Sequence, residues 1–298
     1  MSTTEHDTLS PDEAFALVGH ETRVAILRAV MDAANESGEP YGAVSFSELR
    51  DRVGMRDSGQ FNYHLGKLVG PFLERDGKGY RMRYTTLLVM GAILAGTYTE
   101  RGDAEPVTVD SPCPSCGGVV QATYENDRGI VQCVDCEDVF CSASIPAGAL
   151  EGYDREEYPR VFKQWTTRLM GEMQSGFCLA CTGRVRARVA VTAPGADGNG
   201  RGDDPEVVVH YECQRCPEAA HTSLGAALLD HPAMVSFHWD HAIDTRGVDL
   251  WDVPWLYDEH AHVVSEAPLR VECRAELDGE TLVVTVDESL DVLDVVRD

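Results

Sequence analysis

Eight of the ten cysteines in this 298-residue chain form four Cys-x-x-Cys pairs, and no other feature constrains its fold as strongly. Two such pairs at the base of a β-hairpin bring four thiolates within tetrahedral reach of one Zn²⁺, which is the zinc-ribbon arrangement. Four pairs therefore predict two zinc ions per chain. The predicted ligands are Cys113, Cys116, Cys133 and Cys136 for the first ion, and Cys178, Cys181, Cys213 and Cys216 for the second.

The segments between the paired cysteines have the pattern of β-hairpins. Residues 117–132 alternate between apolar and polar side chains. In the second insert, 185–191 are expected to pair with 206–211 across an Asp- and Gly-rich loop at 194–205. Because every ligand position is a thiolate, neither ion keeps a position for water or substrate, and both are expected to be structural. The two zinc ribbons are predicted at 113–141 and 178–216.

The charge composition points to a chain adapted to molar salt. Fifty Asp and Glu accompany 25 Lys and Arg, which gives a formal net charge of −25. Lysine occurs only at Lys67, Lys78 and Lys163. Hydrated carboxylates keep a protein soluble in concentrated salt, so this acidic and lysine-poor composition favours a halophilic origin over an ordinary acidic protein.

The sequence predicts a cytoplasmic protein without a membrane span. Its first ten residues carry neither the basic nor the apolar region of a secretory signal. The longest apolar stretch, 86–98, is too short to cross a bilayer and predicts a buried helix. Without export, ten cysteines favour metal ligation over disulfides. Cys141 and Cys273, which lie outside the pairs, are expected to be core residues.

Residues 1–100 contain no cysteine but hold a basic island, since eight Lys or Arg accompany only four acids between 50 and 83. The elements expected in this segment occur in the order of a winged helix-turn-helix, which is predicted over 10–100. A linker is predicted at 101–112. The expected elements are a helix with a capping box at 10–13, a helix at 21–34, a short strand at 44–46, a helix capped by Ser47 and ending at Val53, a polar-faced helix at 58–69, and a hairpin at 72–84 with a basic, Gly-rich tip.

The same segment resembles the ArsR-like transcription regulators, in particular the haloarchaeal ones. The resemblance is carried by Asn62-Tyr63-His64-Leu65 with Leu68, by Gly70-Pro71-Phe72-Leu73 and by Tyr80-x-Met82 at the end of the wing. It implies DNA binding, and pairing of two chains through the helix at 86–98. Metal-sensing members of that family carry cysteines in the helix before the recognition helix, and residues 47–53 have none. Metal sensing is therefore not implied.

Sequence readout is expected from the polar face of the helix at 58–69. Amide side chains such as Gln60 and Asn62 read adenine in the major groove, while hydroxyl and basic groups hold phosphate and sugar. His64 lies beside an apolar residue and is expected to be a packed, hydrogen-bonded histidine. The alternative is that the basic island is a solvated face and the fold contacts protein. The predicted DNA contacts are Ser58, Gln60, Asn62, Tyr63, Lys67, Arg75, Lys78 and Arg81.

The remaining motifs indicate structure and not catalysis. The chain has no HExxH, Walker A or nucleophile-elbow motif, and the Pro-Cys-x-x-Cys at 112–116 lacks the upstream His-x-Glu of zinc deaminases. An enzyme is not expected. An amphipathic helix is predicted at 154–174 and a β-hairpin at 268–287. Structural or core roles are expected for His238, His241, His260, His262, Trp165, Trp239, Trp251 and Trp255.

These patterns predict an α+β chain, with an N-terminal winged helix-turn-helix and a zinc-ribbon-containing α/β domain at 113–298. The predicted function is sequence-specific binding of double-stranded DNA by a homodimeric transcription regulator, with no membrane partner and no identified effector. The alternative is a zinc-ribbon adaptor that binds protein or RNA in the transcription or translation machinery. A salt titration on duplex DNA distinguishes the two functions.

Overall fold

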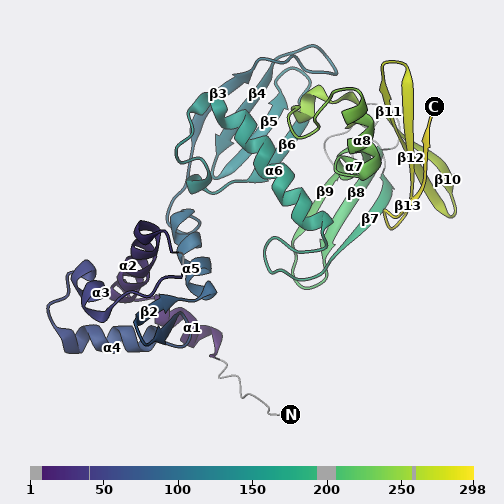
Figure 1. Ribbon diagram of the computed structural model, residues 1–298. Helices are drawn as coiled ribbons and strands as arrows, with labels where there is room; N and C mark the ends of the chain where they lie inside the picture. Colours follow the sequence, from purple (N-terminus) through teal and green to yellow (C-terminus); the bar gives the residue numbers. More distant parts are fainter. Residues whose placement is uncertain (1–8, 40, 193–205, 257–259) are drawn as a thin grey trace, which may run out of the picture. The chain divides into compact units, whose positions relative to one another are not determined.

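The protein is α+β and divides into two compact units, Met1–Glu100 and Arg101–Asp298 (Figure 1). The computed structural model describes residues 9–39, 41–192, 206–256 and 260–298. Among these residues, no helix combines the length and the apolar character that crossing a membrane requires. The α+β class predicted from the sequence is confirmed.

The first unit packs helices around one short hairpin. Most of its helices have side-chain N-caps that explain where they begin. Ser10 forms a capping box with Glu13, and Asp57 accepts hydrogen bonds from two backbone N–H groups of the helix that follows it. The elements are α1 (Pro11–Val18), α2 (Glu21–Ser37), α3 (Phe46–Val53), α4 (Ser58–Leu68), β1 (Leu73–Asp76), β2 (Gly79–Met82) and α5 (Tyr84–Leu94).

The core of this unit forms where one apolar face of each helix meets the others. Its fully buried side chains come from α2, α3, α4, β1 and α5, and they include Leu27, Leu49, Phe61, Leu73 and Met90. Phe61 and Leu65 are one helical turn apart, so both point to the same side of α4. This packing leaves the opposite side of α4 to solvent.

The start of α3 differs from the sequence prediction. Val44 exchanges two backbone hydrogen bonds with Tyr80, of 2.8 and 2.9 Å, but this is a single bridge and not a strand. Helix α3 begins at Phe46, and Ser45 caps it by accepting a hydrogen bond from Glu48 N at 3.2 Å. The predicted strand at 44–46 and the cap at Ser47 are therefore wrong. Ser45 has an extended backbone and follows the bridge residue directly, and it is the N-cap of α3, so the chain passes from the bridge into the helix without forming a strand.

Helix α5 also differs from its prediction as a buried helix at 86–98. It spans Tyr84–Leu94, and within it only Thr86 and Met90 are buried. Leu88 is 55% exposed and Leu94 is 54% exposed. A single helix on the outside of a small core can bury only one face, so a helix that is apolar all round leaves apolar side chains in solvent.

The described residues of the second unit form three antiparallel sheets (Figure 1). The first has the order β3 (Ala104–Val109), β4 (Val120–Glu125), β5 (Arg128–Cys133), β6 (Val139–Ser144). The second has the order β7 (Val185–Thr192), β8 (Glu206–Cys213), β9 (Ala219–Ser223). The third has the order β10 (Ala261–Glu266), β11 (Leu269–Leu277), β12 (Glu280–Asp287), β13 (Val292–Arg297).

Helices connect and cover these sheets. Helix α6 packs against β5 and β6 of the first sheet and also contacts β7 of the second. Short helices cover the second and third sheets, whose inner faces share one core that includes Val209, Tyr211, Phe237 and Val284. The helical segments are α6 (Tyr158–Gln174), α7 (Leu224–Leu228) and α8 (Pro232–Asp240), with 3₁₀ turns at Ala147–Ala149, Arg155–Glu157, Leu250–Asp252 and Pro254–Leu256.

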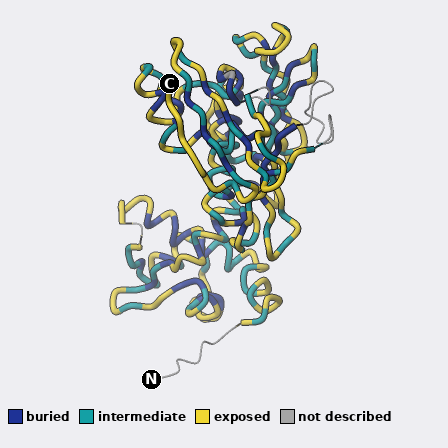
Figure 2. Tube along the Cα trace, turned by 90° about the vertical axis from the view of Figure 1, so that its right-hand side faces the viewer, coloured by how far each residue is buried: buried dark blue, intermediate teal, exposed yellow. Residues whose placement is uncertain are grey.

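Two sequence predictions change at the ends of this unit. The linker predicted at 101–112 contains β3, which pairs with β4 and places Val107 opposite Ala122. The partly buried Val107 and Val109 pack against the core of the first sheet, which is why this polar segment forms a strand. The hairpin predicted at 268–287 forms the two central strands of a four-stranded sheet, between β10 and β13. Every residue of the edge strand β13 is exposed (Figure 2).

Candidate metal centres and the polar face of α4

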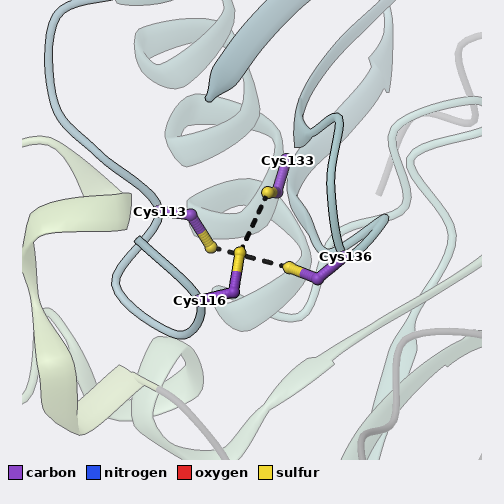
Figure 3. A group of neighbouring side chains, drawn as sticks. All are labelled: Cys113, Cys116, Cys133 and Cys136. Carbon is purple, nitrogen blue, oxygen red and sulfur yellow. Dashed lines mark hydrogen bonds between the residues drawn. The ribbon is translucent and has the colours of Figure 1, made fainter. Parts of the chain in front are cut away.

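The first cysteine group lies at the base of the β4–β5 hairpin of the first sheet. Cys113 and Cys116 precede β4, and Cys133 ends β5, so the β4–β5 pairing brings the two motifs together. The Sγ atoms of Cys113 and Cys136 are 3.6 Å apart, and those of Cys116 and Cys133 are 3.5 Å apart (Figure 3). All four Sγ atoms lie within 4.8 Å of one another, and all four thiols are free.

These distances fit a tetrahedral metal site. Four thiolates at about 2.3 Å from a central ion are about 3.8 Å from one another. Backbone donors also point at the sulfurs: Gly118 N donates to Cys116 Sγ and Asp135 N donates to Cys133 Sγ, each at 3.4 Å. Such N–H groups stabilise sulfur in its ionised form, in which it ligates a metal. The donor set and its surroundings therefore suit a bound cation.

The second group repeats this geometry in the second sheet. Pairing of β7 with β8 places Val185 opposite Cys213 and so brings the two motifs together. The Sγ atoms of Cys178 and Cys216 are 3.6 Å apart, and those of Cys181 and Cys213 are 3.5 Å apart. These four Sγ atoms also lie within 4.8 Å of one another. The two four-cysteine groups are thus compatible with two metal sites per chain.

The thiol environments set Cys113 and Cys213, one cysteine of each group, apart from the two cysteines outside the groups. Burial raises the pKa of Cys113, but hydrogen bonds from the backbone of Cys116 and Ser115 outweigh it and hold that pKa at about 6. By contrast, burial raises the pKa of Cys141 and of Cys273 to about 12. Both of these thiols are buried in apolar clusters, so they stay protonated and pack as core residues.

The second candidate site is the exposed face of α4 in the first unit. Phe61, His64, Leu65 and Leu68 are buried, and they leave the rest of the helix surface polar. Lys67 Nζ lies 5.7 Å from the centre of the Tyr63 ring. The predicted contact residues of this helix are all exposed: Ser58, Gln60, Asn62, Tyr63 and Lys67.

The basic residues of the β1–β2 hairpin differ in how far they are exposed to solvent. Arg75 and Lys78 are exposed. Arg81 is half-buried, with its guanidinium 3.2 Å from Glu74 Oε1 and 3.9 Å from Asp76 Oδ2. Arg81 is thus held by two carboxylates of its own hairpin, which the sequence pattern did not reveal.

His64 is packed beneath the polar face of α4, as expected, but its hydrogen bonding differs from the prediction. Its side chain is 6% exposed, and its ring lies 4.4 Å from that of His20. Within the described residues, Nδ1 of His64 has no hydrogen-bond partner. Burial, helped by His20 and Arg23, lowers the pKa of His64. His20 was missed because a contact across 44 sequence positions leaves no local pattern.

The C-terminal histidines and tryptophans are not arranged as a metal site. His241 Nδ1 pairs with the carbonyl of Phe237 at 2.9 Å, and within the described residues only the two cysteine groups cluster as candidate ligands. Trp251 and Trp255 are buried, whereas Trp239 is exposed. The Asp- and Gly-rich loop predicted at 194–205 lies outside the described residues.

Comparison with known protein families covers most of both units. Residues 110–292 match the family described as a domain of unknown function, DUF7351. The chain belongs to this family. Residues 11–93 match a second domain of unknown function, DUF7347. No curated protein and no solved structure matches the chain.

Proposed function

We propose that the protein is a sequence-specific DNA-binding transcription regulator of the ArsR-like type, whose first unit is a winged helix-turn-helix. The observation that carries this proposal is the exposed polar face of α4 beside a hairpin with exposed basic residues. A helix of this kind enters the major groove, and basic residues on an adjacent hairpin hold phosphates. Gln60 and Asn62 supply the amides that read base edges.

In this proposal, both cysteine groups hold Zn²⁺, and both ions are structural. Zinc is the metal that four-thiolate tetrahedral sites most often bind. A site with four thiolate ligands has no open position for water or substrate, so these ions stabilise the second unit and do not catalyse a reaction.

We also propose that two chains pair through α5. Leu88 and Leu94 are more than half exposed, and so are Tyr84 at the start of α5 and Tyr98 beyond its end. Burying such a surface against a second copy removes it from water. A dimer also presents two α4 helices to two half-sites of one DNA duplex.

One observation favours the adaptor alternative. Arg52 is bound by Glu36 and Glu48 at 2.7 and 3.0 Å, and Arg81 is bound by two carboxylates of the hairpin. These ion pairs reduce the positive charge that the island offers to phosphates. A zinc-ribbon adaptor that binds protein needs less of that charge, so this observation favours the protein-binding form of the alternative over the RNA-binding one.

The test is a selection of duplex sequences on the full-length protein in molar KCl, followed by affinity measurements on the selected duplex. Gln60→Ala and Asn62→Ala should each weaken specific binding by about 1–3 kcal/mol if the contacts are bidentate. The matched control is Gln214→Ala, which removes an exposed amide from the second unit. Selection of no sequence, or unchanged affinity in both α4 variants, rejects the proposal in favour of the adaptor.

A further inference from the structure

A cavity of about 850 Å³ lies between β6 and β9, the strands at the adjacent edges of the two cysteine-bearing sheets. Its walls include every residue of Val139–Ser144 and of Ala219–Ser223. Successive residues of a strand point to opposite faces of its sheet, so a cavity over one face touches alternate residues. Contact with consecutive residues shows that this cavity runs along the edges of both strands.

The backbone of β6 turns hydrogen-bonding groups toward this cavity. The carbonyl of Ser144 accepts a hydrogen bond from Trp165 Nε1 at 3.0 Å, so it points away from β5. Backbone groups alternate in direction along an antiparallel strand, and Ser142 therefore points its N–H and C=O the same way as Ser144. Ser142 lies in the middle of the exposed edge of β6.

The same reasoning orients β9. Cys213 N donates to the carbonyl of Glu218 at 3.0 Å, so the backbone of Glu218 faces β8. Two and four residues further on, Ala220 and Thr222 also face β8. His221, between them, points its N–H and C=O toward the cavity. Within the described part of the chain, neither Ser142 N nor His221 N has a hydrogen-bond partner across the cavity.

The size and charge of the cavity identify its ligand class. Cavities that enclose ligands have volumes of about 300–1,000 Å³. Among the described residues, the walls carry the carboxylates of Asp138, Glu206 and Glu218 and a single arginine. Asp138 accepts a hydrogen bond from Ser115 Oγ at 3.3 Å, and the arginine, Arg128, donates through Nε to Ser142 Oγ at 3.0 Å. Apolar side chains of α6, among them Leu169, also line the space. A ligand with backbone donors and acceptors, apolar groups and a positive charge matches these walls.

We propose that the cavity binds an extended, basic peptide segment of a partner protein, which adds a strand between β6 and β9. Strand addition uses main-chain hydrogen bonds for affinity, and side chains that alternate along the strand for specificity. About five residues, at about 3.3 Å per residue, match the length of the two edges. This interaction is independent of DNA binding by the first unit.

The proposal is tested by selecting a random heptapeptide library, displayed on phage, on the full-length protein in molar KCl. Enriched peptides should carry Lys or Arg, and fluorescence anisotropy should show loss of affinity by roughly tenfold in Ser142→Pro and in His221→Pro. Proline removes one outward N–H and is tolerated on edge strands where that group faces away from the sheet. Unchanged metal content and thermal midpoint establish that each variant is folded.

A matched control is Thr108→Pro on β3, the opposite edge of the first sheet. Val134 N donates to the carbonyl of Val119, so the backbone of Val119 faces β5. Because backbone groups alternate in direction along a strand, Val120 faces its β3 partner Val109, and the N–H and C=O of Thr108 point outward. This variant should bind the selected peptides like the unmodified protein. The selected peptides with alternate backbone nitrogens methylated should lose affinity, a result that needs no protein variant to fold.

Three outcomes overturn the proposal. The first is that selection enriches no sequence, and the second is that it enriches acidic or uncharged peptides. The third is that the peptides bind both proline variants, or survive backbone methylation, with unchanged affinity. None of these results bears on the DNA affinity of the first unit.

Discussion

Trp255 Nε1 donates a hydrogen bond of 2.7 Å to His238 Nε2, and both side chains are buried. On the other side of the same ring, Nδ1 of His238 lies 2.7 Å from the carbonyl of Met234. Because the carbonyl and Nε2 are both acceptors, the proton is on Nδ1 and the imidazole is neutral. This pair joins α8 to the 3₁₀ turn at Pro254–Leu256.

His238 should therefore make stability depend on pH. Burial lowers the pKa of His238 below its ordinary 6.5, although its bond to Met234 opposes this. The unfolded chain binds a proton near pH 6.5 and the folded one does not, so this contribution is complete above about 6.5 and is lost as the pH falls below it. The thermal midpoint of the second unit should fall from pH 7.5 to pH 5.5.

His238→Gln isolates this effect from other titrating groups, including the cysteine thiols. A glutamine side chain keeps an acceptor for Trp255 but does not titrate. Its thermal midpoint should fall less over the same pH range than that of the unmodified protein. An equal fall in both proteins would contradict the assignment of a neutral, buried His238.

Metal content should depend on each cysteine group separately. Purified protein should contain two zinc ions per chain, and Cys113→Ser with Cys116→Ser should leave one, as should Cys178→Ser with Cys181→Ser. Structural zinc binding contributes about 10 kcal/mol to folding, so each ribbon should unfold locally when its ion is lost. The first unit should stay folded in both variants, which amide hydrogen exchange in α2 and α4 can follow. The matched control, Cys273→Ala, removes a core thiol and should keep both ions.

The exposed face of α5 should control oligomeric state. Light scattering in molar KCl should return about twice the chain mass of 32.6 kDa for the unmodified protein. Leu88→Glu should shift the protein toward the monomer, because a charge in an apolar contact is costly to bury. Val264→Glu, a similarly exposed apolar position on β10, should not. A monomeric unmodified protein would contradict pairing through α5.

Lys78 and Arg81 of the hairpin should differ in their effect on DNA affinity. Lys78→Ala should weaken binding to all duplexes about equally and reduce the salt dependence by about one phosphate contact. Arg81→Ala should have a smaller effect, since its guanidinium already pairs with Glu74 and Asp76. Arg246→Ala, an exposed arginine of the second unit, is the control. A larger effect from Arg81→Ala would show that the ion pairs open on DNA.

The features that could be predicted from the sequence are those that depend on near neighbours. The Cys-x-x-Cys spacing identified both four-cysteine groups, because a knuckle and its hairpin are encoded in a few adjacent residues. The capping box at Ser10 and the turn at Asp278-Gly279, whose φ angles are 53° and 87°, follow from the same kind of local chemistry.

Only the tertiary structure decided which surfaces meet. Strand β3 lies in a polar segment whose composition is typical of a linker. It forms because its backbone pairs with the edge of β4. The exposure of Leu88, the bond between Trp255 and His238 and the cavity between β6 and β9 likewise depend on residues far apart in the chain. Local patterns specify an element and its apolar face, whereas the partner that covers that face is selected by long-range packing.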